Sequence, residues 1–257
     1  MKRSITSTDK RLYSLLAVVF WLLVWQCASM AMGELFLASP VAVLKTLAAQ
    51  IGKSAFWHTI AFSLMRITTG FSLAFVLGIS LASASARIPV VRELLHPIVS
   101  IIQATPVASF IILALLWFGS HNISLVISFL MVFPILYTST LSGIDAIDCK
   151  LLEMAQVFDI TLSRRIFYIY LPGVMPFFLS GCRIGLGLCW KSGIAAEVIG
   201  WPAGSIGEQL YQAKLYLQSS DLFAWTAVII AISALFERVV LWLLRRFEHF
   251  VKDGGAL

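Results

Sequence analysis

The sequence predicts an all-α, polytopic membrane protein with about six transmembrane helices. Of its 257 residues, 60% are hydrophobic and 12% are charged, whereas a soluble domain carries about 25% charged residues. The mean hydropathy is +0.91, and several apolar stretches reach the roughly 20 residues that a spanning helix needs. A soluble core could not bury this much apolar surface, so lipid must be the solvent for much of the chain.

Six apolar stretches are predicted to cross the membrane. They run from about Leu12 to Met32, Thr59 to Ala86, Val99 to Phe118, Ile123 to Leu141, Pro172 to Val198 and Leu222 to Leu244. The first follows four basic residues and precedes Ala28-Ser29-Met30-Ala31, as in a secretory signal peptide. Its full spanning length and the five later spans favour a retained first helix.

The placement of Lys and Arg predicts the orientation of the chain. With the N-terminus inside, twelve of these residues fall in inner segments and three fall in outer segments. Basic residues collect on the cytoplasmic side, so both termini are expected in the cytoplasm. We expect one transmembrane domain over residues 1–257, with a tail and first span in 1–36 and the core spans in 57–250.

Several function classes are disfavoured by the residues present. The net charge of +6 fits anionic lipid headgroups better than nucleic acid. The four Cys and four His residues form no metal-binding spacing, so we expect neither a metal nor another cofactor in this chain. Gly52-Lys53-Ser54 ends like a phosphate-binding loop, but Leu47 stands where that loop needs glycine. With no catalytic motif, an enzyme is not expected.

The segment 142–171 is a long inner loop with helical periodicity. Leu151, Leu152, Ala155 and Phe158 share one face, and Asp159 interrupts the pattern. Thr161 is placed to cap a second short helix that ends at Leu171-Pro172, where the fifth span begins. Two such amphipathic helices serve either as a docking surface for another protein or as an interfacial pair resting on headgroups.

This loop resembles the "EAA…G…I..LP" signature of permease subunits of binding-protein-dependent, type I ABC importers. The matching residues are Glu153-Met154-Ala155, Asp159, Ile169 and Leu171-Pro172. Other segments are similar to the nitrate/sulfonate/taurine group of that family: Leu37 to Pro40, Ser63 to Gly70, Ala104 to Pro106, Trp117 to Gly119 and Gly181 to Glu197. The sequence departs from the signature at two positions, since the signature usually has Gly at Asp159 and Ala at Met154.

The resemblance implies the type I importer permease fold and an assembly in the bacterial inner membrane. Two copies of the chain would form the translocation pathway for a small solute such as an anion. Two separate ATP-binding subunits, which carry the ATP and Mg, would dock on the loop, and an extracytoplasmic solute-binding protein would deliver the substrate. The implied coupling residues are Glu153, Met154, Ala155, Phe158, Asp159, Thr161, Arg164, Leu171 and Pro172.

Polar residues inside predicted spans are candidates for the translocation pathway because charge is costly in lipid. They are Arg183, Lys191 and Glu197 in the fifth span, with Gln103 and Pro106 in the third. Pairing between helices is the alternative role. Gly181 and Gly185 form a GxxxG motif that fits a dimer interface or packing within one subunit.

A stand-alone secondary transporter or channel is the alternative function. Such transporters usually contain inverted repeats and broken helix pairs, and the sequence shows no convincing internal repeat. Genes for an ATP-binding subunit and a secreted binding protein beside this one would favour the importer.

Overall fold

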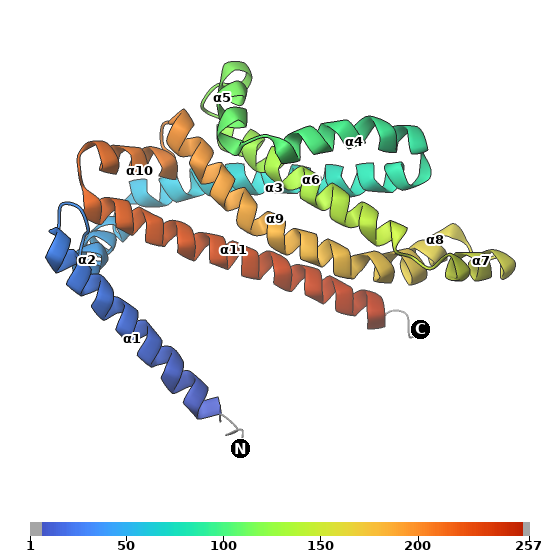
Figure 1. Cartoon of the computed structure of the whole chain (residues 1–257), viewed down its shortest axis with the longest axis horizontal. Helices are drawn as coiled ribbons and strands as arrows, with labels where there is room; N and C mark the ends of the chain where they lie inside the picture. The colour runs from blue at the N-terminus through green and yellow to red at the C-terminus, as the bar shows by residue number, and fades with distance from the viewer. Residues whose placement is uncertain (1–6, 254–257) are drawn as a thin grey trace. The chain divides into compact units, whose positions relative to one another are not determined.

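The protein is helical throughout the part described by a computed structural model, residues 7–253 (Figure 1). The chain ends, residues 1–6 and 254–257, whose cytoplasmic location the sequence predicts, lie outside the described residues. In chain order the helices are α1 (Ser7–Met32), α2 (Pro40–Ile51), α3 (Ser54–Arg87), α4 (Pro89–Ala104), α5 (Val107–Phe118), α6 (Ile123–Asp145), α7 (Cys149–Val157), α8 (Leu162–Arg165), a π-helical turn η1 (Ile166–Tyr170), α9 (Leu171–Gly200), α10 (Ile206–Leu215) and α11 (Ser219–Asp253).

Five helices in the described residues are long and apolar enough to cross a membrane, and a bent pair provides a sixth candidate. The predicted spans one, two, four, five and six correspond to α1, α3, α6, α9 and α11. The all-α polytopic fold class is therefore confirmed. The structure extends α3 to 34 residues, roughly 51 Å, well beyond the roughly 30 Å hydrocarbon core.

The third predicted span is not a continuous helix. Its residues lie in α4 and α5, which are bent by 111° at the break between them. Pro106 stands at the N-cap of α5, where its missing N–H removes the helical hydrogen bond to Ile102. Figure 1 shows α5 rising steeply from the end of α4. With 12 residues, α5 is roughly 18 Å long and does not span a bilayer by itself.

The chain divides into two compact units. One comprises residues up to His58 together with Gln209–Ile229. In it, Pro40 and the capping residue Ser39 start α2, and the indole of Trp25 donates a hydrogen bond to the Ala38 carbonyl at 3.1 Å. The small core of this unit gathers Ala38, Val43 and Ala224. The segments 33–58 and 199–221, which are predicted to lie outside and lack predicted spans, contain α2 and α10.

The second unit comprises Thr59–Glu208 and the chain from Ile230 on, and its centre is the pair α6 and α9. Small residues allow the close approach of these two helices. A Cβ added at Gly181 would lie 2.5 Å from the Ser139 hydroxyl, and one at Gly193 would lie 2.6 Å from the Ser128 hydroxyl. The GxxxG segment of α9 therefore packs within the subunit, one of the two roles that the sequence left open.

Candidate functional site

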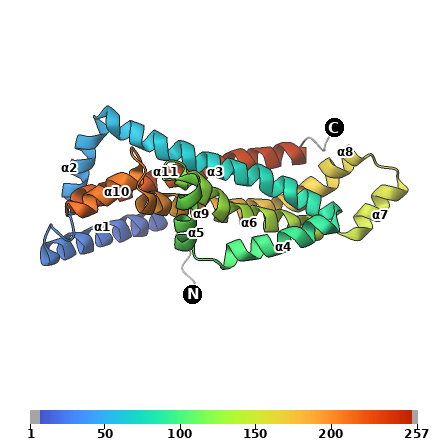
Figure 2. The same ribbon diagram turned by 90° about the horizontal axis from the view of Figure 1, so that it is seen from above.

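The loop between α6 and α9 forms two short helical segments at one end of these helices (Figure 2). Asp148 caps α7 by accepting a hydrogen bond from the Lys150 N–H at 2.9 Å. The C-terminus of α7 closes with paired bonds: the Asp159 N–H donates to Gln156 and the Ile160 N–H donates to Ala155. This is a Schellman ending, and it requires Asp159 to adopt a left-handed conformation with φ of 48°.

The second loop helix differs from its prediction in two ways. Thr161 occupies the N-cap position of α8, but its hydroxyl makes no capping hydrogen bond. The helix also does not end before the fifth span, because α8 continues through the π-helical turn and Leu171-Pro172 directly into α9. Pro172 lies in the first turn of α9, inside this continuous run, so it cannot donate to the Tyr168 carbonyl. Just before it, the Leu171 N–H donates to the Ile166 carbonyl five residues back, as in a π-helix.

The far end of α7 presents apolar side chains that no described residue covers. Val157 is 80% exposed and Phe158 is 72% exposed, and Met154 and the Glu153 carboxylate are also exposed. Ala155 is fully buried against the rest of the chain. Arg164 and Asp159 are exposed beside this surface. The end of α7 therefore combines an apolar tip with an acidic side chain, an arrangement suited to contact with another protein.

Two cations lie on the face of α9 that is not packed against α6. Arg183 and Lys191 are exposed, and neither forms an ion pair among the described residues. Between them, a Cβ added at Gly187 would meet no atom within 4 Å, so this face borders open space. Lys191 lies nine residues before the end of α9 at Gly200, roughly 14 Å along the helix.

Glu197 points to a different side of α9 and is fully buried. Its Oε2 accepts hydrogen bonds from the Ser63 hydroxyl at 2.7 Å and from the Gly207 N–H at 3.2 Å. Ser63 in turn accepts from the Ile206 N–H at 3.0 Å. Its Oε1 has no hydrogen-bond partner in the described part of the chain. The carboxyl group thus joins α3, α9 and the start of α10, a role that residue spacing did not indicate.

The break between α4 and α5 leaves polar groups exposed. Gln103 and Pro106 are exposed, and the Thr105 hydroxyl donates back to the Ile101 carbonyl at 2.7 Å. Backbone groups freed by a helix break at membrane depth are tolerated only where they are buried in protein or line a water-filled cavity. The break therefore remains a candidate for lining a passage.

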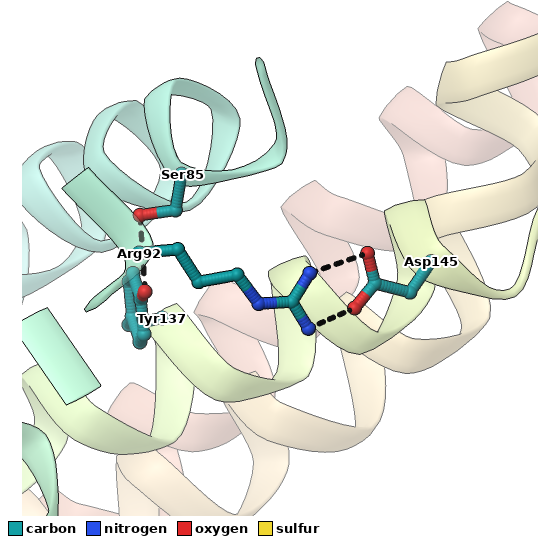
Figure 3. Close-up of polar contacts among 4 residues, drawn as sticks. All are labelled: Ser85, Arg92, Tyr137 and Asp145. Carbon is teal, nitrogen blue, oxygen red and sulfur yellow. Dashed lines mark hydrogen bonds and ion pairs between the residues drawn. The ribbon is translucent and has the colours of Figure 1, made fainter. Parts of the chain in front are cut away.

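A polar link that the sequence did not reveal connects α3, α4 and α6 near the loop (Figure 3). Arg92 binds both oxygens of Asp145, with nitrogen–oxygen distances of 2.8 and 3.3 Å, and the Tyr137 hydroxyl donates to Ser85 at 3.0 Å. Asp145 is the last residue of α6, just before the loop. The sequence did not indicate this pair, because the two residues are 53 positions apart.

Comparison with known proteins relates this architecture to transport. Residues 74–253 match the family model described as "Binding-protein-dependent transport system inner membrane component". The chain is 30% identical to the taurine transport system permease protein TauC of Escherichia coli, covering 92% of this chain and 86% of that protein. It is 27% identical to a putative aliphatic sulfonates transport permease protein of Bacillus subtilis, SsuC, over 82% of this chain and 76% of that protein.

Two further similarities concern substrate diversity and fold. The bicarbonate transport system permease protein CmpB of Synechococcus elongatus is 30% identical over 76% of this chain and 70% of its own length. A solved structure of an amino acid ABC transporter with histidines aligns with a TM-score of 0.52 at 19% identity, covering 75% of this chain and 93% of that one. At that identity the structural match indicates a shared fold.

Proposed function

Because the chain belongs to the family of binding-protein-dependent transport system inner membrane components, it is a multi-pass permease subunit of an ABC importer, and we propose that it couples to separate ATP-binding subunits through α7. The observation that carries this proposal is the exposed tip of α7, where Val157 and Phe158 stand beside Glu153. A 72–80% exposed apolar pair at a helix end is stabilised by a covering partner. The excess of basic residues in inner segments supports a cytoplasmic position for this loop.

The partners in this proposal are two ATP-binding subunits, a second copy of the chain and an extracytoplasmic solute-binding protein. ATP and Mg belong to the ATP-binding subunits. A second copy is supported by Arg183 and Lys191, since a cation facing lipid at the centre of a span costs at least ~2.5–3.5 kcal/mol. Covering that face of α9 with a second subunit and enclosed water removes the cost.

The substrate that suits this face is a small anion. Arg183 and Lys191 supply two positive charges without a described acidic partner, and Gly187 leaves space between them. Gln103 and Pro106 at the helix break are proposed to line the same passage. Glu197 is proposed to act indirectly. Its hydrogen bonds would fix the rotation of the outer end of α9 about the helix axis. The names of the relatives, which point to taurine, sulfonates and bicarbonate, support a solute with an anionic group, since each of these carries one.

Glu153→Arg tests the coupling surface. We expect the variant to insert normally but to lose the co-purifying ATP-binding subunit in mild detergent, because the substitution reverses the charge beside the apolar tip. Glu153→Gln serves as the matched variant with the same length and no reversed charge. Normal complex yield and normal uptake by Glu153→Arg would overturn the coupling proposal.

Lys191→Met tests the passage. If Lys191 faces the substrate, the variant keeps its thermal stability and oligomeric state but transports anions more slowly. A Cys at position 191 in a Cys-free background should then react with a small water-soluble thiol reagent. Reaction with lipid-phase reagents alone would place this face of α9 against lipid and refute the assignment.

The proposed topology has an independent test. Reporters that work only in the cytoplasm should be active when fused to either terminus, because six crossings return the chain to the side on which it began. An inactive C-terminal fusion beside an active N-terminal one would imply an odd number of crossings.

A further inference from the structure

Arg165 binds two backbone carbonyls at the junction of the loop helices. Its Nε donates to the Ile160 carbonyl at 2.7 Å, and its Nη2 donates to the Ala155 carbonyl at 3.1 Å. The first acceptor lies just past the end of α7 and the second lies in its last turn. The guanidinium thus reaches back from α8, over ten residues of chain, to the end of α7.

The turn that Arg165 contacts contains the one left-handed residue of the loop. Asp159 has φ of 48°, a conformation that costs most L-residues about 1–2 kcal/mol and that glycine adopts freely. The two bonds of the Schellman ending offset part of this cost. Arg165 adds two charged donors at the negative end of α7, where a cation is stabilised by the helix dipole.

Two carbonyl acceptors at this helix end would be less satisfied without Arg165. The Ala155 carbonyl receives both the Ile160 N–H and the guanidinium, while the Ile160 carbonyl receives the guanidinium. The side chain is half-buried and Ala155 is fully buried, so water has limited access to replace these donors. The fork geometry matters because one guanidinium reaches both carbonyls at once.

We infer that Arg165 is a positioning residue for the docking surface, holding the α7–α8 turn in its left-handed form and so fixing the direction of the α7 tip. This inference rests on the proposed coupling function. Phe158 and Glu153 lie on the α7 side of the turn, so an open turn would let their orientation relative to α8 vary. For a partner that binds only the closed form, the apparent affinity is the intrinsic affinity multiplied by the fraction of closed turns.

The first test measures the turn itself in the purified full-length chain. A glutamate-specific protease cleaves after Glu153, in the middle of α7, only when α7 opens, and the cleavage rate reports the open population. Arg165→Met keeps the apolar stem and removes every donor, so we expect cleavage after Glu153 to rise about tenfold. Arg87→Met is the matched control, since Arg87 is exposed at the end of α3 and makes no hydrogen bond in the described structure.

The decisive test is suppression by Asp159→Gly. Glycine closes the turn without the left-handed cost, so Arg165→Met/Asp159→Gly should return cleavage close to the wild-type rate. Arg165→Lys keeps the charge but not the forked guanidinium, so its cleavage rate should lie between those of wild type and Arg165→Met. Cleavage in Arg165→Met equal to wild type, or a double variant that opens as much as the single one, would overturn the inference.

Affinity for the ATP-binding subunit that co-purifies with wild type separates the two proposals. If the wild-type turn is open about a fifth of the time, a tenfold rise in its open-to-closed ratio should make Arg165→Met bind the subunit roughly threefold more weakly. The melting temperature of the permease should be unchanged, and the affinity should recover in the double variant. An unchanged affinity in a variant with faster cleavage would refute the positioning role and leave the coupling proposal intact. A wild-type chain that captures no ATP-binding subunit would instead refute the coupling proposal.

Discussion

Ser63→Ala removes one hydroxyl that satisfies two buried groups. The Ser63 hydroxyl donates to Glu197 Oε2 at 2.7 Å and accepts from the Ile206 N–H at 3.0 Å, and Ser63 and Glu197 have no exposed surface. Without it, the carboxyl group keeps the Gly207 N–H as its remaining donor, and the Ile206 N–H loses its acceptor. The unsatisfied Ile206 N–H costs about 1–3 kcal/mol, and the lost hydrogen bond to the carboxyl group costs about 1 kcal/mol more, so the variant should be destabilised by about 2–4 kcal/mol.

The assay is thermal unfolding of the detergent-solubilised chain, followed by tryptophan fluorescence. A loss of about 2–4 kcal/mol corresponds to a fall in melting temperature of roughly 4–16 °C for a chain of this size. Ser72→Ala is the matched control: it lies on the same helix, is exposed, and bonds only to its own helix through the Thr68 carbonyl. That variant should change stability by less than about 0.5 kcal/mol.

The difference in melting temperature between Ser63→Ala and Ser72→Ala tests whether the buried hydrogen bonds stabilise the chain. If Ser63→Ala melts within a degree or so of Ser72→Ala, the contact between α3, α9 and α10 contributes no net stability. The hydrogen bonds of Glu197 would then be replaced by others on unfolding within the detergent, and its role in fixing the rotation of α9 would lose its basis.

Two further variants probe close contacts elsewhere in the same unit. Gly207→Ala should lower the melting temperature more than Gly52→Ala, because the added Cβ would lie 2.3 Å from Glu197 Cβ, whereas the same addition at Gly52 meets nothing within 4 Å; equal melting temperatures would contradict this packing. Breaking the Arg92–Asp145 pair with Asp145→Asn should cost at most about 1 kcal/mol, since both side chains are 43–47% exposed. A double-mutant cycle with Arg92→Met should give a coupling that weakens as salt is raised, and a salt-independent coupling would argue against an ion pair.

Periodicity and charge placement were sufficient to predict the membrane class and most of the helices. Five of the predicted spans correspond to single helices, four of them within about five residues at each end, while α11 runs nine residues beyond the predicted end at Leu244. A bilayer demands long apolar segments, and these are visible in any window of sequence. The loop helices were also predictable, since Ala155 and Asp159 mark a buried position and a helix end. The third span was wrong as a continuous helix, although Pro106 was the visible signal of its break.

The polar contacts depended on tertiary structure. Residue spacing placed Arg183, Lys191 and Glu197 on one helix, but only the packing of α9 against α6 separates the exposed cations from the buried carboxyl group. Arg92 and Asp145 are 53 residues apart, and nothing local in either segment indicates the other. Such contacts arise where helices cross.

By itself, the sequence therefore determined that this is a membrane protein and which family it resembles. The length of the apolar segments, the basic segments predicted to lie inside and the Glu153-to-Pro172 signature are all local properties of the chain. What only the tertiary structure decided is which polar groups satisfy one another. Glu197 accepts a hydrogen bond from Ser63, which is 134 positions away. Arg165 donates a hydrogen bond across a folded turn to the end of α7. The physical reason is that lipid constrains every spanning segment separately, whereas a buried donor or acceptor is constrained by whichever helix lies beside it.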